Sequence, residues 1–157
     1  MVKSKSFTRL SSLEVSVILT QTDTTVGFLS QNAKKLYEIK SRNTTKPFIR
    51  VYSNFKTLLS FGHRIPNKFK NSVRRSKKTT FIVKNTAFRV VEPSLDSQIL
   101  KNLQWNFSTS ANESTKKFHR EFCEKKADII VEDNEGLHEY SSSSLIKIGK
   151  IKRRKIR

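Results

Sequence analysis

The sequence is poor in the residues from which many enzymes build their sites: it has one cysteine, three prolines and four glycines. Cys123 alone forms no internal disulfide, and no recognised Cys–His signature surrounds it. Because the glycines are far apart, the chain has neither a G-x-x-x-x-G-K-[ST] phosphate loop nor a G-x-G-x-x-G fingerprint. A phosphate site in this chain must therefore be built from side chains.

Acidic residues are also scarce. Thirteen Asp and Glu stand against 32 Lys and Arg, which gives a formal net charge of +19. This balance favours polyanionic partners such as RNA, DNA, nucleotides or anionic lipid, although the richness in Lys, Asn, Ile, Phe and Ser also fits a general compositional bias. No apolar run approaches bilayer-spanning length and no signal-peptide core follows Met1, so we expect a cytoplasmic protein without membrane contact.

No resident metal site is predicted either. The three histidines, His63, His119 and His138, are far apart and lack ligand spacing. The acidic run Glu132–Asn134 is better explained as a hairpin turn than as a cation site.

Segments of strand and helix character alternate along the chain without internal repeats. Several strands are hairpin-linked, which favours one α/β (α+β) domain with a twisted, mixed, open sheet flanked by helices over residues 1–149. Residues 150–157 are expected to be a mobile basic tail, too charged to pack. The predicted strands are Glu14–Thr20, the run from Pro47, 79–84, 87–91, 103–107, 127–132 and 144–149, and the predicted helices are 32–40, 54–60, 66–75, 94–103 and 116–125.

One stretch that can handle phosphates is KSRNTTKPF, in which Lys40, Arg42 and Lys46 lie where a helix ends and a strand begins. Cations are favourable at a helix C-terminus in any case, by about 0.3–1 kcal/mol. However, Arg42 and Lys46 lie beyond the expected helix end, and Pro47 stiffens the exit. Held in this way, the three cations can grip a polyphosphate.

Two neutral stretches accompany it. QTDTTVGF places hydroxyls and one acid after a buried strand, a favoured ligand position that is also ordinary turn chemistry. In FSTSANES, Ser108, Ser110 and Asn112 alternate and project to one side if the segment is extended. They supply neutral donors and acceptors. Alternatively the segment is a turn, with Asn112 capping the following helix.

Taken in order, these stretches resemble the YrdC-like family, the threonylcarbamoyl-AMP synthases (TsaC/YrdC/YciO) of tRNA modification. The family patterns P-T-[DE]-T-x-Y-G-L, K-x-R-x-x-x-K-P and S-x-S-A-N have counterparts in QTDTTVGF, KSRNTTKP and STSAN. The segments AFRVVEP, ADIIVED and SSSLI resemble later family strands. The sequence departs from the family pattern at four places. Gln21 replaces a proline and Val26 a tyrosine, which is expected to loosen an apolar wall against the substrate. The Pro-Gly segment before Thr80 is missing, and Lys147 replaces an aspartate.

The resemblance implies that L-threonine, bicarbonate or CO2 and ATP, with Mg2+, give threonylcarbamoyl-AMP and pyrophosphate, without a covalent protein nucleophile. It implies an ATP site and a threonine site. The ATP-binding residues would be Lys40, Arg42, Lys46, Thr80, Ser110 and Asn112. The threonine-binding residues would be Thr22, Thr24, Arg89, Ser108, Ser143 and Ser144.

Two other function classes remain open at this stage. One is a non-catalytic RNA-binding paralogue of the same fold, for which the charge alone predicts salt-sensitive affinity. The other is a carbamoyl-transfer relative that would bind carbamoyl phosphate in the cavity expected for the synthase substrates. For a synthase, the resemblance also implies tRNA contact and downstream threonylcarbamoyl-transfer proteins as partners.

Overall fold

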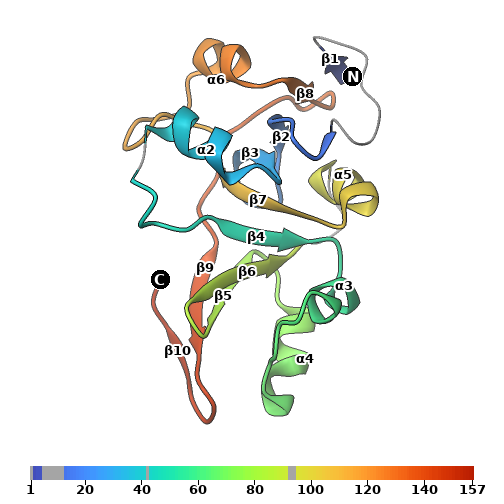
Figure 1. Cartoon of the computed structure of the whole chain (residues 1–157), viewed down its shortest axis with the longest axis vertical. Helices are drawn as coiled ribbons and strands as arrows, with labels where there is room; N and C mark the ends of the chain where they lie inside the picture. Colours follow the sequence, from blue (N-terminus) through green and yellow to red (C-terminus); the bar gives the residue numbers. More distant parts are fainter. Residues whose placement is uncertain (1, 5–12, 42, 92–94) are drawn as a thin grey trace.

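The computed structural model describes residues 2–4, 13–41, 43–91 and 95–157, with the backbone alone for 2–4 and 95–97. Its strands form one mixed sheet in the order β1-β8-β2-β3-β7-β4-β6-β5-β9-β10 (Figure 1). The strands are β1 (Val2–Ser4), β2 (Ile18–Gln21), β3 (Val26–Ser30), β4 (Ile49–Tyr52), β5 (Thr79–Val83), β6 (Thr86–Val90), β7 (Trp105–Ser110), β8 (Ile129–Val131), β9 (Ser144–Ile148) and β10 (Arg153–Lys155). The predicted mixed, open sheet is confirmed.

Helices pack on both faces of this sheet. They are α2 (Ala33–Lys40), α3 (Phe55–Ser60), α4 (Asn67–Arg75), α5 (Leu95–Leu103) and α6 (Arg120–Lys126). The helices α2 and α6 pack against Leu19 and Phe28 on one face of the strands β2 and β3. Leu100 and Leu103 of α5 pack against Ile18 and Leu29, which point to the opposite face.

A third core cluster lies at the other end of the sheet. There α3 and α4 contribute Phe55, Leu58 and Val73 against Phe81 and Phe88 of the β5–β6 hairpin. We refer to residues 49–91 and 144–157, which carry β4, β5, β6, β9 and β10 with α3 and α4, as the lower half of the molecule. Figure 1 shows that the strands turn from nearly horizontal in β7 and β4 to steep in β9 and β10, so the sheet is strongly twisted.

Local sequence signals explain where several helices begin. The Oδ1 of Asn32 accepts a hydrogen bond from the backbone N–H of Lys35 (3.3 Å), and the Oδ1 of Asn54 accepts one from Thr57 (2.8 Å). Pro66 immediately precedes α4, and the expected basic helix ends at Arg75 as predicted. These starting points, and the β5–β6 strand pair, are confirmed.

Several predictions about local structure are wrong. The predicted strand Glu14–Thr20 begins only at Ile18, and residues 14–16 form a turn. The predicted helix from Lys116 begins only at Arg120, where the Nδ1 of His119 accepts from the N–H of Phe122 (3.3 Å). The strand β3 was not predicted, because its residues follow directly on a hydroxyl-rich turn. Residues 150–157 are not a mobile tail, because Arg153–Lys155 form β10, which pairs antiparallel with β9. Strand pairing uses backbone groups, and the cationic side chains of residues 151–157 remain exposed.

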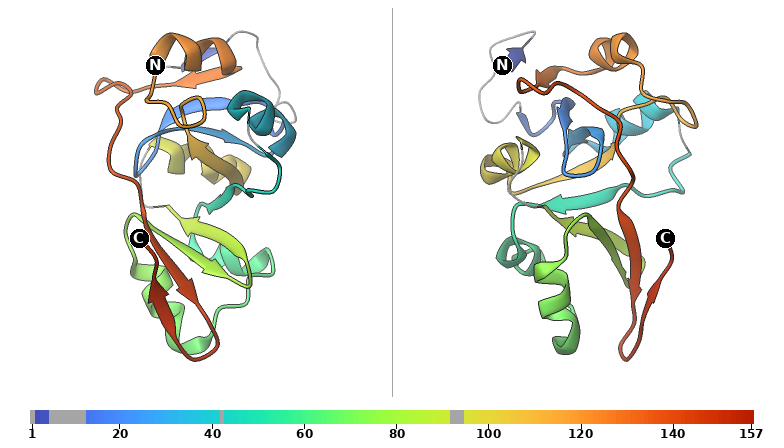
Figure 2. Two further views of the ribbon diagram at one scale, coloured as in Figure 1. Left: turned by 90° about the vertical axis from the view of Figure 1, so that its left-hand side faces the viewer. Right: turned by 180° about the vertical axis from the view of Figure 1, so that it is seen from behind.

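The segment between β8 and β9 connects the two ends of the sheet. It runs over the back of the molecule, as Figure 2 (right) shows. The carbonyl of His138 accepts from the N–H of Val26 (3.0 Å), and the N–H of Tyr140 donates to Thr25 Oγ1 (3.3 Å). These contacts bring Ser142 and Ser143 beside the turn that precedes β3. Within the described ranges, no helix combines the length and apolar character that crossing a bilayer requires.

Candidate functional site

A cavity of about 310 Å³ opens where β3, β7, β4 and β6 meet the segment that precedes β9. Strand register places its floor on one face of the sheet, because Gly27 is paired with Ser110 and Ile49 with Ser108. This is the face that α5 covers elsewhere, so the helices α2, α3, α4 and α6 lie on the other side. The lining residues are Thr22, Thr24, Thr25, Gly27, Pro47, Phe48, Ile49, Arg89, Ser108, Thr109, Ser110, Ser142, Ser143 and Arg157.

A buried ion pair supports one wall of this first cavity. The Nη2 of Arg89 lies 3.0 Å from Oδ1 of Asp23, and both side chains are only 5% exposed. The Nη1 of Arg89 donates to Thr24 Oγ1 (3.1 Å), and Thr24 Oγ1 lies 3.2 Å from Thr22 Oγ1. The Nε of Arg89 is buried and has no hydrogen-bond partner among the described residues. The acid of the TDT stretch therefore neutralises and orients an arginine that faces the cavity.

Gly27 allows two walls of this cavity, the TDT turn and β7, to lie close together. A Cβ at this position would lie 3.0 Å from the carbonyl oxygen of Thr109 and 3.0 Å from Cγ2 of Thr22. Such contacts are shorter than real Cβ atoms normally make, so any larger residue would displace the TDT turn or the strand β7. The glycine lets the two walls approach each other.

A second cavity, of about 320 Å³, lies beside the first and shares Thr109 and Ser110 with it. The two therefore adjoin along the last residues of β7. Two lysines supply the charge of the second cavity, and the rest of its lining is neutral. The lining residues are Lys40, Lys46, Thr109, Ser110, Asn112, Ser114 and Thr115.

The ammonium of Lys40, at the end of α2, fixes the STSAN loop. This residue is only 4% exposed, and its Nζ donates to the carbonyl oxygens of Ser110 (3.0 Å) and Asn112 (2.6 Å) and to Asn112 Oδ1. Ser110 Oγ also donates to Asn112 Oδ1 (2.8 Å). The alternative that Asn112 caps the following helix is wrong, because His119 is the cap of α6. Residues 107–110 of FSTSANES belong to β7, so only its second part is a turn.

The structure places most of the predicted site residues in these two cavities. The predicted threonine-binding residues Thr22, Thr24, Arg89, Ser108 and Ser143 line the first, and the predicted ATP-binding residues Lys40, Lys46, Ser110 and Asn112 line the second. Thr80 and Ser144 line neither of them. Thr80 is buried just behind the site, where its Oγ1 lies 2.8 Å from Ser143 Oγ. Arg42 lies outside the described residues.

Arg157 is a lining residue that sequence reasoning missed. Its Nε donates to the carbonyl oxygen of Ser143 (3.3 Å), and its carbonyl accepts from the N–H of Leu145 (2.9 Å). The β9–β10 hairpin brings it to the first cavity. The sequence signal for this hairpin was Gly149, which directly follows the alternating pattern of β9 and indicates a turn. The charge of residues 150–157 favoured a mobile tail instead, so the second strand of the hairpin was not predicted.

Three of the four departures from the family pattern, Gln21, Val26 and Lys147, lie outside both cavities. Val26 is buried in the core under α2 and α6, and does not form the cavity wall that was expected of it. Gln21 Oε1 accepts from the N–H of His138 (2.8 Å), which holds the segment between β8 and β9 against β2. Lys147 is exposed on β9. These three replaced residues therefore line neither cavity.

The electrostatics of the site suit an anionic ligand. Neither lining contains a carboxylate. Burial raises the pKa of the Cys123 thiol, which is consistent with the expectation that it is not a nucleophile. In the part of the chain that the structure describes, no cluster of His, Cys, Asp and Glu could hold a metal ion.

Comparison with known families identifies the fold. Residues 15–157 match the profile of the Sua5/YciO/YrdC family, described as "telomere recombination". The chain belongs to the Sua5/YciO/YrdC family. No curated protein matches the sequence.

Solved structures show the same fold at low sequence identity. The Sua5 of P. abyssi in complex with L-threonine is 16% identical, with a TM-score of 0.75 over 90% of this chain and 50% of that one. The YciO of E. coli is 16% identical, with a TM-score of 0.74 over 94% and 85%. A full-length HypF in the phosphate- and nucleotide-bound form is 12% identical, with a TM-score of 0.77 over 100% and 25%. The chain thus spans about half of the length of Sua5 and a quarter of that of HypF.

Proposed function

We propose that this chain is an L-threonylcarbamoyladenylate synthase, which converts L-threonine, bicarbonate or CO2 and ATP to threonylcarbamoyl-AMP and pyrophosphate. The observation that carries the proposal is the pair of adjoining cavities. One is lined by hydroxyls and arginine and the other by lysines, and they share Thr109 and Ser110. Two substrates bound side by side would meet at this shared strand end.

The first cavity offers what an amino acid needs. Arg89 lines this cavity and can offer an N–H group to a carboxylate, and the Asp23 side chain keeps the guanidinium in place from behind. The hydroxyls of Thr24 and Ser143 can serve the ammonium and the side-chain hydroxyl of threonine, because each can both donate and accept. The Thr22 hydroxyl donates to the carbonyl of Thr25 (2.7 Å) and accepts from the N–H groups of Thr24 and Thr25, so it fixes the turn that carries Thr24. The P. abyssi Sua5 structure, which shares this fold, contains L-threonine.

The second cavity suits the phosphates of Mg-ATP. Lys40 and Lys46 supply positive charge, and Arg42 lies between them in the sequence. Mg2+ would arrive with the nucleotide as part of the substrate, held by phosphate oxygens and water, since it needs few protein ligands. The neutral Ser110 and Asn112 would orient the α-phosphate near the first cavity.

The chemistry then requires positioning more than covalent assistance. The amine of threonine attacks bicarbonate or CO2 to form a carbamate, with loss of water in the first case. A carbamate oxygen attacks the α-phosphate, and the bond to the β-phosphate breaks to release pyrophosphate. Fixed cations and hydrogen-bond donors at the reacting phosphate lower the barrier by proximity and charge stabilisation.

The test is release of pyrophosphate from purified protein with ATP, threonine and bicarbonate. We expect release that depends on threonine, that falls at least tenfold in Lys46→Ala, and that is unchanged in Lys34→Ala, an exposed lysine on α2 outside both cavities. Release without threonine, or full activity in a Lys40→Ala, Arg42→Ala double variant, would refute the assignment. A thermal shift with ATP and threonine provides an independent readout of binding.

The same ligand response separates the alternatives. A non-catalytic RNA-binding paralogue would be stabilised by polyanions and not by threonine. A carbamoyl-transfer relative would respond to carbamoyl phosphate. We favour the synthase because Gln21, Val26 and Lys147 line neither cavity.

A further inference from the structure

The central strands β7 and β4 carry aromatic side chains on the face of the sheet that α2 and α3 share. Nine rings follow one another across this face, and each ring centroid lies between 4.4 and 6.5 Å from the next. In order they are Tyr37, Phe48, Phe107, Trp105, Phe61, Tyr52, His63, Phe88 and Phe81. Figure 1 shows no helix crossing β4 or the middle of β7, which lie between α2 and α3. The middle of the aromatic row therefore lies at the surface between two groups of helices.

Arg50 lies at the centre of this surface. Strand pairing places it between Phe107 of β7 and Phe88 of β6. Its Cζ atom lies 5.5 Å from the ring centroid of Phe107 and 5.6 Å from that of Trp105. Burial raises the pKa of the Tyr52 hydroxyl, and Arg50, which lies near it, offsets part of that rise. Aromatic groups thus hold an exposed guanidinium in one place.

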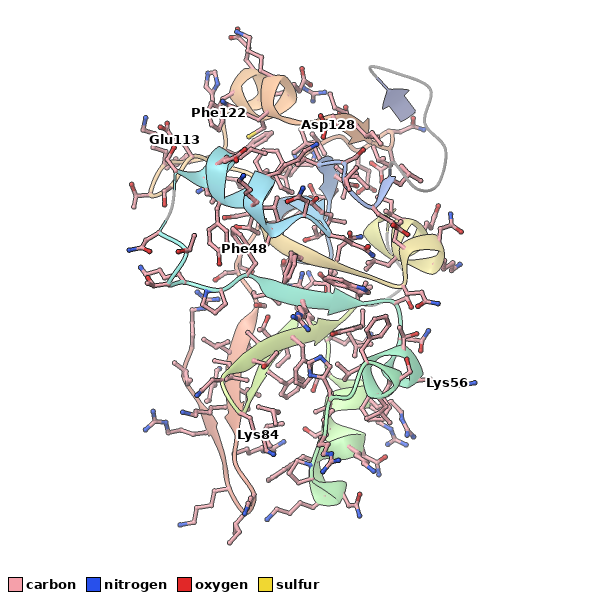
Figure 3. All side chains as sticks on the ribbon, viewed as in Figure 1. Phe48, Lys56, Lys84, Glu113, Phe122 and Asp128 are labelled. Atoms are coloured by element: carbon pink, nitrogen blue, oxygen red, sulfur yellow. The ribbon has the colours of Figure 1, made fainter. Side chains whose placement is uncertain are left out.

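This guanidinium has no carboxylate partner within ion-pair distance in the part of the chain that the structure describes. The whole lower half contains none of the 13 Asp and Glu. Figure 3 shows Lys56 pointing outward from α3, whereas Glu113 and Asp128 lie in the upper part. A guanidinium binds a carboxylate through two parallel hydrogen bonds, and less entropy is lost on binding when its position is already fixed.

The residue types around Arg50 are those of protein interfaces. We name Arg50, Phe61, Trp105 and Phe107 the Arg50 patch. The side chain of Phe61 is 43% exposed, and those of Trp105 and Phe107 are partly buried. Aromatic residues and arginine are enriched at interfaces, and Trp and Arg are prominent among the residues that dominate binding. We propose that the Arg50 patch binds an acidic segment of another protein, in which an Asp or Glu pairs with Arg50 and a neighbouring apolar side chain packs on Phe61 and Trp105.

The same contacts disfavour two other occupants. Single-stranded nucleic acids stack their bases on free aromatic faces, but the guanidinium of Arg50 already lies over the rings of Trp105 and Phe107. A second copy of the chain would bring Arg50 and the other cations of the lower half close to their own counterparts, without an acid between them. An acidic partner is complementary to this surface.

The test begins with the chemistry of the partner. Random short peptides without tryptophan, displayed on phage, would be selected on the full chain in the presence of an excess of soluble Arg50→Gln protein. This competitor removes the peptides that recognise only the net charge of +19. We expect the selected peptides to carry Asp or Glu beside Phe, Leu or Ile. A selection that enriches no peptide, or only peptides without a carboxylate, would overturn the proposal.

The fluorescence of Trp105, the only tryptophan of the chain, reports binding of the best peptide at the patch itself. We expect Kd to weaken about tenfold or more in Arg50→Gln, and less than about threefold in Arg75→Gln, which removes the same charge from an exposed arginine at the end of α4. Arg50→Lys keeps the charge but loses the planar fork, so it should resemble Arg50→Gln. Equal weakening in Arg50→Gln and Arg75→Gln, or full binding in Arg50→Lys, would overturn the proposal because charge alone would then decide.

Further measurements identify the class of partner. Replacing Asp and Glu of the peptide by Asn and Gln should weaken binding about as much as Arg50→Gln does, and Phe61→Ser should weaken it as well; unchanged binding in either case would overturn the proposal. Displacement of the peptide by single-stranded RNA would assign the patch to nucleic acid instead. A dimer in sedimentation that dissociates in Arg50→Gln would assign it to a second copy of the chain. None of the four patch residues lines either cavity, so pyrophosphate release and circular dichroism should be unchanged in the variants, which shows that they are folded.

Discussion

The buried pair of Asp23 and Arg89 gives the sharpest test of how the site is built. Replacing Asp23 by leucine keeps the branched shape of the side chain, with somewhat larger methyl groups in place of the oxygens, but leaves the guanidinium of Arg89 in a position where it is only 5% exposed. Breaking a buried ion pair by removing one partner costs about 3–5 kcal/mol, because an uncompensated charge stays in the interior. For a domain of this size, 1 kcal/mol corresponds to about 2–4 °C in Tm, so Tm should fall by roughly 6–20 °C.

The second variant separates the charge from the packing. In Asp23→Leu, Arg89→Met both charges are gone and two apolar side chains face each other. Such replacements of a buried pair are often neutral or stabilising. We therefore expect the double variant to be more stable than Asp23→Leu, with a coupling energy of about 1–3 kcal/mol. It should nevertheless lose threonine binding, because Arg89 would no longer face the first cavity.

The assay is urea unfolding followed by the fluorescence of Trp105, the only tryptophan of the chain, which lies in β7 and packs against the core of the lower half. Salt should change the loss little, since buried pairs are screened far less than exposed ones. A loss below about 1 kcal/mol would place the pair among weak surface ion pairs and refute the argument. The cycle is completed by Arg89→Met alone, and a double variant whose loss of stability equals the sum of the losses in Asp23→Leu and in Arg89→Met would refute the argument as well.

Two further predictions concern single positions. Gly27→Ala should destabilise the protein by about 1–3 kcal/mol and weaken threonine binding, since its Cβ would lie 3.0 Å from Thr109 and Thr22; Gly149→Ala, where the nearest contact is 3.4 Å, is the control in urea unfolding. Burial and the charge of Arg50 lower the pKa of His63, whose Nε2 lies 2.7 Å from Tyr52 Oη. As the pH falls below the ordinary pKa of 6.5, the unfolded chain therefore binds more protons than the folded protein, so the free energy of unfolding should decrease. The decrease should be less steep in His63→Gln. Parallel plots of the free energy of unfolding against pH for the two proteins would contradict this.

How far the sequence predicts this fold depends on where the information lies. Helix α2 follows from the cap Asn32 and the apolar spacing behind it, all within a few residues. The strand β10 could not be predicted in this way, because it is held by backbone pairing with β9 and its side chains are charged and exposed. Its pairing therefore depends on a neighbour and not on its own apolar pattern.

The same distinction applies to the site. The three polar stretches are visible in the sequence, but their division between two cavities follows from strand register, which pairs Gly27 with Ser110 and Ile49 with Ser108. The partner of Arg89 was also not predictable from spacing, since Asp23 is 66 residues away and reaches it only through the folded sheet. The polar residue types of the site could be predicted from the sequence, whereas the pairing of the strands decides which of these residues face each other.

The two lysines of the second cavity show why location alone does not define a role. Lys40 is buried and its ammonium binds the loop carbonyls of Ser110 and Asn112, so its replacement would disturb the loop as well as any phosphate. A loss of activity in Lys40→Ala alone therefore cannot distinguish phosphate binding from loop positioning. Lys46 is exposed at the same cavity. Its charge can be removed without disturbing that loop, so a rise in KM for ATP in Lys46→Ala with unchanged stability is the result that would assign the phosphates to this cavity.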